Sequence, residues 1–390
     1  MTDIHLHYIE KGEGVPLILL HGNGENGGYF EHQLECFSKR YRVIAVDTRG
    51  HGDSPRGSRP FSIQQFAEDL HDFMDDMGVL KAILLGFSDG GNVALCFSLK
   101  YPERVLKLIL NGANLEPAGV KPRYQWPIVV GYYLARCFSK MSEKAKRNAE
   151  MLGLMVKEPQ IDPAELARLS MPVLVIAGTN DMIKDSHTRL IYSSLSNARL
   201  FVVEGDHFIA NRRPFAFNAA VKLFLSGYVV RHSTVEELPI ILRLRDQARD
   251  IMRSYGNRAQ WPDGYPPDDR FVKDLEAGGS YVVLNEEGEI VAAFALLSGP
   301  EETYHVIEEG QWLNDEPYHV IHRIASTPES HGVLEAVLNF ADTCCRNIRI
   351  DTHESNFIMR KGLERHGYQY CGIIHLLNGD ERLAFQRIEQ

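Results

Sequence analysis

One short stretch of the sequence has the residue types and spacing that nucleophilic catalysis requires. In Gly86-Phe87-Ser88-Asp89-Gly90 a serine stands between two glycines, after the apolar run 82–85 and before a helix-like segment. A serine hydroxyl held clear of a sheet needs a very sharp turn, where side chains two residues away would collide. Glycines remove those side chains. We therefore predict that Ser88 is a nucleophile on a strand–turn–helix elbow.

A serine nucleophile needs a base, and two other apolar runs end in candidates. Asp181 follows the run 173–177, and His207 follows the run 200–203. An imidazole can take the serine proton, and a carboxylate can hold the imidazole in one tautomer. We expect His207 to be the base and Asp181 to be the acid that orients it.

Other residues compete with Asp181 for the role of the acid. Asp185, or Asn114 and Glu116 just past the fourth apolar run, could supply it instead. Asp206 adjoins the histidine in sequence, but neighbouring side chains point apart, so it is a poor partner.

These residues need a scaffold, and the apolar runs predict one. The runs are mostly continuous rather than alternating, as in strands that are covered on both faces. Helix-length segments such as 62–78 and 90–101 separate them. Strands alternating with helices predict a doubly wound, mainly parallel α/β sheet, with its chemistry outside the carboxyl ends of the strands. The runs are 17–20, 43–46, 82–85, 106–110, 173–177 and 200–203.

Two glycine-rich turns complete a pattern that resembles a known family. His21-Gly22-Asn23-Gly24 follows the first run, and residues 47–54 (Asp-Thr-Arg-Gly-His-Gly-Asp-Ser) follow the second. With the serine elbow, Gly178 to Asp181 and Gly205-Asp206-His207, they make residues 1 to about 226 resemble an alpha/beta-hydrolase. We interpret His51, inside the second turn, as structural.

The resemblance assigns the catalytic roles. It implies that Ser88 is the nucleophile, His207 the base and Asp181 the residue that orients it. It also implies that the backbone N–H groups of Asn23 and Asp89 bind the oxyanion. Loss of one such donor typically costs about 3 kcal/mol of transition-state stabilisation.

Residues 115–170 interrupt the alternation of strand and helix. The segment is rich in aromatic residues, and in this family such an insertion is a cap over the active site that restricts substrates and water. We expect most of its aromatic side chains to pack the cap onto the body. They are Tyr124, Trp126, Tyr132, Tyr133 and Phe138.

Length and composition bound the remaining possibilities. At 390 residues, 44% hydrophobic and 24% charged, the chain is expected to form two globular domains. A net charge of −10 argues against nucleic acid or an anionic membrane surface as a partner. Six scattered cysteines and the absence of a visible signal peptide or membrane span predict reduced thiols and a cytoplasmic location. No metal site is predicted.

The second domain is expected to span residues 231–390, after a hydrolase domain of residues 1–230. Thr234 and Glu237 form a predicted capping box that opens a helix reaching about Tyr255. A hairpin and a mixture of strands and helices follow, which predicts an α+β domain. The expected helices are 268–277, 333–345 and 356–366, and the expected strands are 281–284, 290–296, 319–325, 348–350, 371–377 and 382–387.

This order, with Asp351 to Asn356 and His366-Gly367-Tyr368, makes residues 235–390 resemble a GNAT-type N-acetyltransferase. The resemblance implies acetyl-coenzyme A as cofactor. Its diphosphate would lie on the loop from Thr327 to Gly332, at a helix N-terminus. The residues that the resemblance assigns to the cofactor are Ile324 and Ala325 (backbone, pantetheine arm), His331 and Gly332 (diphosphate loop) and Asn356 (near the thiol).

Two positions depart from that family. Its loop usually carries a basic residue and more than one glycine, whereas here Gly332 is followed by Val333, Leu334 and Glu335. Leu363 stands where a tyrosine often acts as general acid. A thiolate can leave without a strong acid, and other residues could assist. They are His322, His353, Tyr368 and Glu308.

The sequence therefore predicts a serine hydrolase that cleaves an ester-like bond of a small molecule, fused to an acetyltransferase-like domain. Two alternatives stay open. The chain could primarily acetylate a small amine, with the hydrolase supporting it. The second domain could instead sense acyl-coenzyme A and regulate the hydrolase without catalysis.

Overall fold

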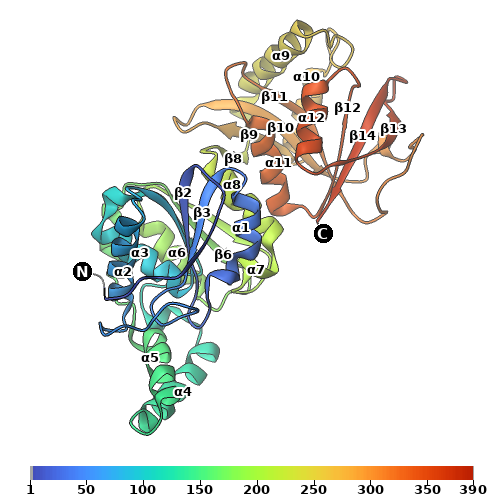
Figure 1. Ribbon diagram of the computed structural model, residues 1–390. Coiled ribbons are helices and arrows are strands. Elements are labelled where there is room, and N and C mark those ends of the chain that lie inside the picture. The colour runs from blue at the N-terminus through green and yellow to red at the C-terminus, as the bar shows by residue number, and fades with distance from the viewer. Residues whose placement is uncertain (1–2, 390) are drawn as a thin grey trace. The chain divides into compact units, whose positions relative to one another are not determined.

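The structure is a computed structural model that describes residues 3–389. The chain divides into two compact units, Met1–Val221 and Lys222–Gln390. Each unit is built on one seven-stranded sheet (Figure 1). Within the described residues, no helix combines the length and the apolarity that crossing a bilayer requires.

The first unit contains the predicted doubly wound sheet. Its strand order is β1-β3-β2-β4-β5-β6-β7, and every strand except β1 is parallel to its neighbours. The chain winds outward in opposite directions from β2 and β4, so the switch point of the topology lies between these strands. The strands are β1 (Tyr8–Lys11), β2 (Val15–Leu20), β3 (Tyr41–Val46), β4 (Ala82–Phe87), β5 (Val105–Asn111), β6 (Val173–Gly178) and β7 (Ala198–Val203).

Helices cover the sheet. Residues of α2, α3 and α6 form one apolar core with the central strands. A buried hydrogen bond joins α1 to α8, where Gln33 Nε2 donates to Asn218 Oδ1 at 2.9 Å. The helices are α1 (Glu31–Phe37), α2 (Ile63–Asp76), α3 (Asp89–Lys100), α4 (Pro122–Phe138), α5 (Glu143–Lys157), α6 (Asp185–Ser194), α7 (Ile209–Arg212) and α8 (Pro214–Leu225).

Strand β1 was not among the predicted strands. It pairs antiparallel with β3 at the edge of the sheet, and all four of its residues are exposed. An exposed edge strand has no need of a continuous apolar run, so its sequence, Tyr-Ile-Glu-Lys, lacks the signal that revealed the buried strands.

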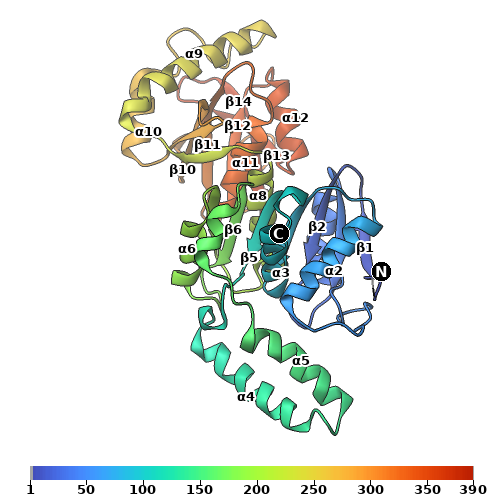
Figure 2. The same cartoon turned by 90° about the vertical axis from the view of Figure 1, so that its left-hand side faces the viewer.

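The predicted cap contains a helical hairpin, α4 and α5, that stands off from the sheet (Figures 1 and 2). The expectation that most of its aromatic residues pack onto the body is wrong. Only Tyr132 is buried, whereas Tyr124, Trp126, Tyr133 and Phe138 are exposed. The hairpin is thin, so one face of α4 packs on α5 and the opposite face meets solvent.

The second unit contains a mixed sheet, as expected for an α+β domain. Its order is β13-β14-β12-β11-β10-β9-β8, and only β11 and β12 are parallel. The strands are β8 (Val229–His232), β9 (Ser280–Leu284), β10 (Ile290–Ser298), β11 (His319–Ser326), β12 (Asn347–Thr352), β13 (Gln369–His375) and β14 (Glu381–Ile388). The helices are α9 (Leu238–Ser254), α10 (Asp268–Glu276), α11 (Val333–Cys344) and α12 (Phe357–Arg365).

Two apolar clusters cover the two faces of this second sheet. Residues of α11 and α12 share one cluster, and residues of α9 and α10 share the other. The predicted capping box is present, and it opens the short turn Val235–Glu237 that leads into α9. The division between units lies after Val221, before the polar stretch chosen from sequence, because Val229–His232 pairs with β9 as an edge strand.

The central strand β11 is irregular where it faces β12. The two strands pair only at His319 with Ile348 and at Val320 with Arg349. Beyond that point no pairing between them is present in the described chain. A register shift against β10 follows, and Arg323 adopts φ 54°. Such bulges commonly re-aim side chains at functional sites.

Candidate active site

The elbow at Ser88 has the strained geometry that its sequence predicts. Ser88 has φ 54° and ψ −122°, a conformation that L-residues rarely adopt, between β4 and α3. A Cβ on Gly90 would lie 2.0 Å from the carbonyl oxygen of Leu20, and one on Gly86 would lie 2.3 Å from that of Gly90. Only glycine fits at either position.

The structure brings the three predicted residues together. The Oγ of Ser88 lies 3.0 Å from Nε2 of His207. The Nδ1–H of His207 donates to Oδ1 of Asp181 at 2.6 Å. The residues follow β4, β6 and β7, so their turns meet at the carboxyl edge of the sheet. This is the arrangement of a serine nucleophile whose histidine base is oriented by a carboxylate.

Strand β5 lies between β4 and β6, and its end leaves room for the imidazole. Gly112 directly follows β5 with φ 62°. A Cβ there would lie 2.6 Å from Cε1 and 2.8 Å from Nδ1 of His207. The ring can therefore reach both Ser88 and Asp181 because residue 112 has no side chain.

The electrostatics suit Asp181 as an anion. Burial alone would raise the pKa of Asp181. The hydrogen bond and charge of His207, together with the N–H groups of Ile183 and Gly178, outweigh burial and bring that pKa below its ordinary value. The carboxylate is thus ionised at neutral pH and stabilises a protonated His207.

The alternative acids have other partners. Asp185 Oδ2 accepts from Arg189 at 2.9 Å on the surface. Asn114 pairs with Asn92 in the interior. Asp206 accepts from the backbone N–H of Phe208 at 2.9 Å and contacts Arg212, so it faces away from the imidazole.

The two residues expected to bind an oxyanion flank Ser88. Asn23 follows β2, Asp89 begins α3, and the backbone N–H of neither donates to another group of residues 3–389. Their side chains hold the turn in place. Asn23 Nδ2 donates to Asp89 Oδ2 at 2.8 Å and to the carbonyl oxygen of Met151 on the cap at 2.8 Å.

The carboxyl group of Asp89 is a feature that sequence reasoning missed. It accepts from Asn23 and Asn92, and it is buried. Burial raises its pKa to about 6, although the two amides lower it in part. Burial likewise raises the pKa of Glu25, in the turn after β2, to about 7. The sequence signal that could have revealed this buried carboxyl group is an acidic residue directly after the predicted nucleophile.

The second glycine-rich turn supports the first. His21 Nδ1 donates to the carbonyl oxygen of Gly22 at 2.7 Å, and Nε2 accepts from the N–H of Thr48 at 3.1 Å. Burial is the main cause that lowers the pKa of His21 to about 4, and the nearby His51 is the second cause. His21 is therefore neutral at pH 7 and shapes the backbone before Asn23.

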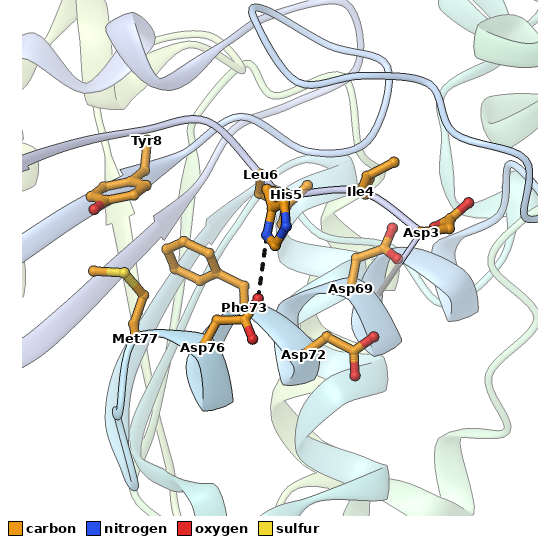
Figure 3. A pocket seen from close by; sticks show the side chains of 10 residues that line it. All are labelled: Asp3, Ile4, His5, Leu6, Tyr8, Asp69, Asp72, Phe73, Asp76 and Met77. Atoms are coloured by element: carbon orange, nitrogen blue, oxygen red, sulfur yellow. Dashed lines mark ion pairs between the residues drawn. The ribbon is translucent and has the colours of Figure 1, made fainter. Parts of the chain in front are cut away.

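A hollow of about 120 Å³ on the first unit lies apart from the triad (Figure 3). The N-terminal segment and α2 line it, and four of its side chains are aspartates. Buried Arg49 neutralises two of them, since its Nη2 donates to Asp3 at 2.7 Å and to Asp69 at 2.6 Å. The hollow is thus the outer side of a structural ion pair.

In the second unit, the predicted diphosphate loop leads into α11. Gly332 precedes the helix and no side chain caps its N-terminus. Tyr228 OH donates to the carbonyl oxygen of His331 at 2.7 Å. The Cδ2 of Leu334 lies 2.3 Å from where a Cβ on Gly362 would be, so the first turn of α11 packs closely on α12. Ile324 and Ala325 lie in the part of β11 that β12 does not pair.

Asn356, which the resemblance assigns to the cofactor, has three partners within the protein. Its Oδ1 caps α12 by accepting from the N–H of Met359 at 3.2 Å, and Tyr255 OH donates to the same oxygen at 3.3 Å. Its Nδ2 donates to Gln260 at 2.9 Å. Asn356 therefore fixes the start of α12.

His322 stands out among the residues considered for proton transfer in this unit. Its Nε2 lies 3.3 Å from Oε2 of Glu301, and its Nδ1 lies 3.7 Å from Oδ1 of Asp351. Tyr304 OH donates to Asp351 at 2.7 Å. The hydrogen bond to His322 lowers the pKa of Glu301 to about 2. The imidazole sits between two carboxylates beside the opening of β11 and β12.

The other candidates are less suited to proton transfer. His353 Nδ1 lies 2.7 Å from Ser355 Oγ, and Glu308 pairs with His375 on the surface. Tyr368 is buried and its hydroxyl has no partner in the described residues. Leu363 is fully buried in the apolar cluster, so that position offers packing and no acid.

The sequence of the first unit matches known proteins. A family model described as the alpha/beta hydrolase fold matches residues 15–141. The chain is 31% identical over 254 residues to the serine hydrolase BPHL of Mus musculus, which spans 58% of this chain and 84% of that protein. This chain belongs to the alpha/beta-hydrolase family. Its hydrolase domain is also similar to a hydrolase of Pseudomonas aeruginosa PA01, at 27% identity, 56% and 94% coverage of the two chains, and a TM-score of 0.47.

The second unit has its own match beside that of the hydrolase domain. A solved GNAT-family acetyltransferase from Streptococcus agalactiae 2603 is 33% identical, with 42% of this chain and 96% of that chain covered and a TM-score of 0.39.

Proposed function

We propose that the hydrolase domain cleaves ester-like bonds of small molecules through an acyl-serine on Ser88. The observation that carries the proposal is the unbroken contact from Ser88 to His207 to Asp181, at 3.0 and 2.6 Å. The similarity to a protein named serine hydrolase supports the same reaction class.

Each residue has one step in this mechanism. His207 Nε2 takes the proton as Ser88 Oγ attacks the carbonyl carbon, and the N–H groups of Asn23 and Asp89 stabilise the oxyanion. The protonated imidazole then gives its proton to the leaving alcohol, which departs and leaves the acyl-serine. Water repeats the sequence with His207 as base, releasing the acid and free Ser88.

Labelling with a fluorophosphonate and turnover of p-nitrophenyl acetate test the proposal. We expect wild type to be labelled and active, and Ser88→Ala to lose both properties. The matched control is Ser98→Ala, which changes a buried serine of the same helix that bonds only to the carbonyl oxygen of Ala94. Undiminished turnover by Ser88→Ala would overturn the proposed mechanism.

We further propose that the second domain binds acetyl-coenzyme A and transfers the acetyl group to a small amine. The observation that favours it is the unpaired edge of β11 beyond Val320, beside the uncapped N-terminus of α11. The free strand edge offers donors and acceptors to amide groups, and the helix N-terminus offers N–H groups to phosphate. Bound there, the cofactor would supply an activated acetyl thioester.

The residues fit the pantetheine part better than the diphosphate. Glu335 is an acid in the first turn of α11, where a phosphate would lie, and the side chain of Leu334 fills the space above α12. The loop itself offers no Lys or Arg. We therefore expect the second domain to bind acetyl-coenzyme A with weak or moderate affinity.

His322 would accept the proton of the attacking amine. Glu301 and Asp351 would attract the ammonium form and then stabilise the imidazolium that proton transfer creates. Net negative charge at the cluster favours a cationic amine over a neutral alcohol as acceptor.

Calorimetry with acetyl-coenzyme A tests the second proposal. We expect heat at near-millimolar cofactor with the full chain, and acetylation of primary amines that His322→Gln reduces without loss of that heat. Absence of heat would assign the second domain a structural role. Binding without transfer would favour the alternative that it senses acyl-coenzyme A, and a change of esterase kinetics on binding would then be required.

We also propose that the chain works in a reducing, cytoplasmic compartment. All six cysteines lie within the described residues and none is in a disulfide. Even the neighbouring Cys344 and Cys345 are free thiols, with their sulfur atoms 3.7 Å apart.

A further inference from the structure

On its outer face, α4 carries more exposed large apolar side chains than any other helix of the described chain. A typical core-facing helix buries such a stripe, but here it meets solvent. We call this set the cap face. Its members are Trp126 (69% exposed), Val130 (53%), Tyr133 (56%), Leu134 (58%) and Phe138 (56%) on α4, with Met141 (82%) in the turn that follows the helix.

The spacing shows that the exposure follows the helix. Positions 126, 130, 133, 134 and 138 recur at intervals of three and four residues, which places them on one side of an α-helix. The opposite side packs on α5. There Tyr132 is buried, and Gln125 donates to the carbonyl oxygen of Met155 at 3.0 Å. The hairpin is therefore held together without the cap face.

The charges of the hairpin differ in sign from those of the whole chain. Residues 121–157 contain eight Lys or Arg and two Glu, in a chain of net charge −10. One of the two acids, Glu150, is paired with Arg56 at 2.7 Å. Exposed basic residues lie next to the cap face and along α5. They are Arg123, Arg136, Lys140, Lys144, Lys146, Arg147 and Lys157.

Apolar aromatic residues on one face with basic residues around them are the pattern of a helix that lies in a lipid interface. A second copy of the chain fits less well. A two-fold contact between cap faces would bring two basic hairpins together, and their charges repel. An anionic surface complements both the apolar face and the charge.

We propose that the α4–α5 hairpin docks on an anionic lipid surface. The cap face enters the boundary between headgroups and acyl chains, and the basic residues contact lipid phosphates. The net charge of the chain, which argues against such a surface, hides this local reversal of sign.

The hairpin is tied to the turns that carry the candidate site. Asn23 Nδ2 donates to the carbonyl oxygen of Met151 on α5, and Lys121 Nζ donates to that of Asp181 at 2.5 Å. A docked hairpin would hold the triad close to the surface, where amphiphilic esters gather. Docking itself requires no turnover, so its test is independent of the hydrolase chemistry.

Co-sedimentation with vesicles tests the proposal. One set contains phosphatidylcholine alone, and the other contains equal parts of phosphatidylcholine and phosphatidylglycerol. We expect the full chain to bind the anionic set, with a blue shift of Trp126 emission that Trp126→Phe removes. Trp261 is buried and serves as an internal reference.

Two variants separate the apolar and the charged contributions. Val130→Ser/Leu134→Ser removes part of the cap face, and Lys144→Glu/Lys146→Glu reverses two charges on α5. We expect each to lower partitioning on anionic vesicles roughly tenfold or more. The first variant loses apolar area that would be buried in the lipid. The second loses basic residues, each of which contributes about 1 kcal/mol near the surface. Turnover of p-nitrophenyl acetate and the melting temperature report that both variants are folded.

Matched controls lie on the same unit outside the hairpin. Leu80→Ser changes an apolar residue that is 80% exposed, and Lys39→Glu/Lys81→Glu makes the same change of net charge. We expect both controls to bind like wild type. Failure of wild type to bind anionic vesicles would overturn the proposal. So would equal loss in the Lys39/Lys81 control, equal binding to both vesicle sets, or a dimer in sedimentation that Val130→Ser/Leu134→Ser dissociates.

Discussion

In the hydrolase domain, three side chains arrive on turns after β4, β6 and β7 and touch one another in an unbroken line. In the second domain, the imidazole of His322 lies between two carboxylates, and beside it β11 and β12 part after one short stretch of pairing. The first site holds its own nucleophile. In the proposed acetyl transfer, the second would supply a base and a free backbone edge, and both the acetyl donor and the amine would come from outside the chain.

The comparison teaches how each site tolerates sequence change. A site that makes its own covalent bond is constrained at single atoms, such as Ser88 Oγ and the missing Cβ of Gly112. If the second domain binds a thioester through backbone groups, as proposed, that site is constrained by strand geometry more than by its side chains.

The largest effect should come from the acid of the triad. Asp181→Asn leaves the geometry and removes the charge, and we expect kcat for p-nitrophenyl acetate to fall about 10⁴-fold. Asp206→Asn is the matched control, because that carboxylate adjoins His207 in sequence and faces Arg212. If the two variants lose activity equally, Asp181 is not the acid of the triad, and the contrast drawn between the two sites fails.

The next effect should appear in the second domain. His322→Gln is expected to slow acetyl transfer to a primary amine by roughly 10³-fold and to flatten its pH profile, as loss of a general base does. The dissociation constant for acetyl-coenzyme A by calorimetry should not change. His353→Gln is the control, and equal profiles for both variants would remove the proposed base.

A methyl group at the end of β5 should damage the hydrolase alone. We expect Gly112→Ala to push the imidazole off its partners and to lower kcat/KM about 10²-fold, the usual result of displacing a catalytic group by about 1 Å. Gly78→Ala is a strict control, because Gly78 has φ 65° and nothing lies within 4 Å of its added Cβ. Equal losses in both variants would trace the effect to backbone strain.

The smallest effect concerns pH and stability. The pKa of Asp89 is raised to about 6 in the folded chain, so folding favours its protonated form. The stabilisation is present below the ordinary pKa near 4 and is lost as pH rises through 6. Relative to Asp89→Asn, we expect wild type to lose about 2 kcal/mol of unfolding free energy between pH 4 and pH 7.

Urea titrations of wild type and of Asp89→Asn across that pH range measure the difference. The amide that the substitution introduces keeps one oxygen acceptor for Asn23 or Asn92 and has no titratable proton. A constant difference across the pH range would show that the buried carboxyl does not titrate there.

The triad was predictable because each member lies shortly after a strand that contains an apolar run. Continuous apolar runs mark such strands, and parallel strands bring their carboxyl ends to one edge. Gly112 carried no such signal, since its importance depends on the position of a ring almost a hundred residues away in the chain. Strands β1 and β8 were missed because exposed edges need no apolar run.

The second site was less predictable because only His322 and Asp351 lie on its strands. Glu301 reaches His322, and Tyr304 reaches Asp351, from a connection between β10 and β11, which sequence periodicity does not place. The resemblance assigns Asn356 to the cofactor, and that stays a prediction; sequence did not show that its amide also contacts α12, Gln260 and Tyr255. The exposure of the cap aromatics was also hidden, because helical spacing reveals a stripe and leaves open what covers it.

The backbone of Ser88 has one further consequence. Its φ of 54° is strained for a serine by roughly 1–3 kcal/mol. Two hydrogen bonds oppose that strain, from its own N–H to Asn111 and from the N–H of Asn92 to its carbonyl. A glycine would relax the turn and abolish the reaction. At this one residue, the fold and the chemistry select different amino acids, and the chain carries the one that chemistry selects.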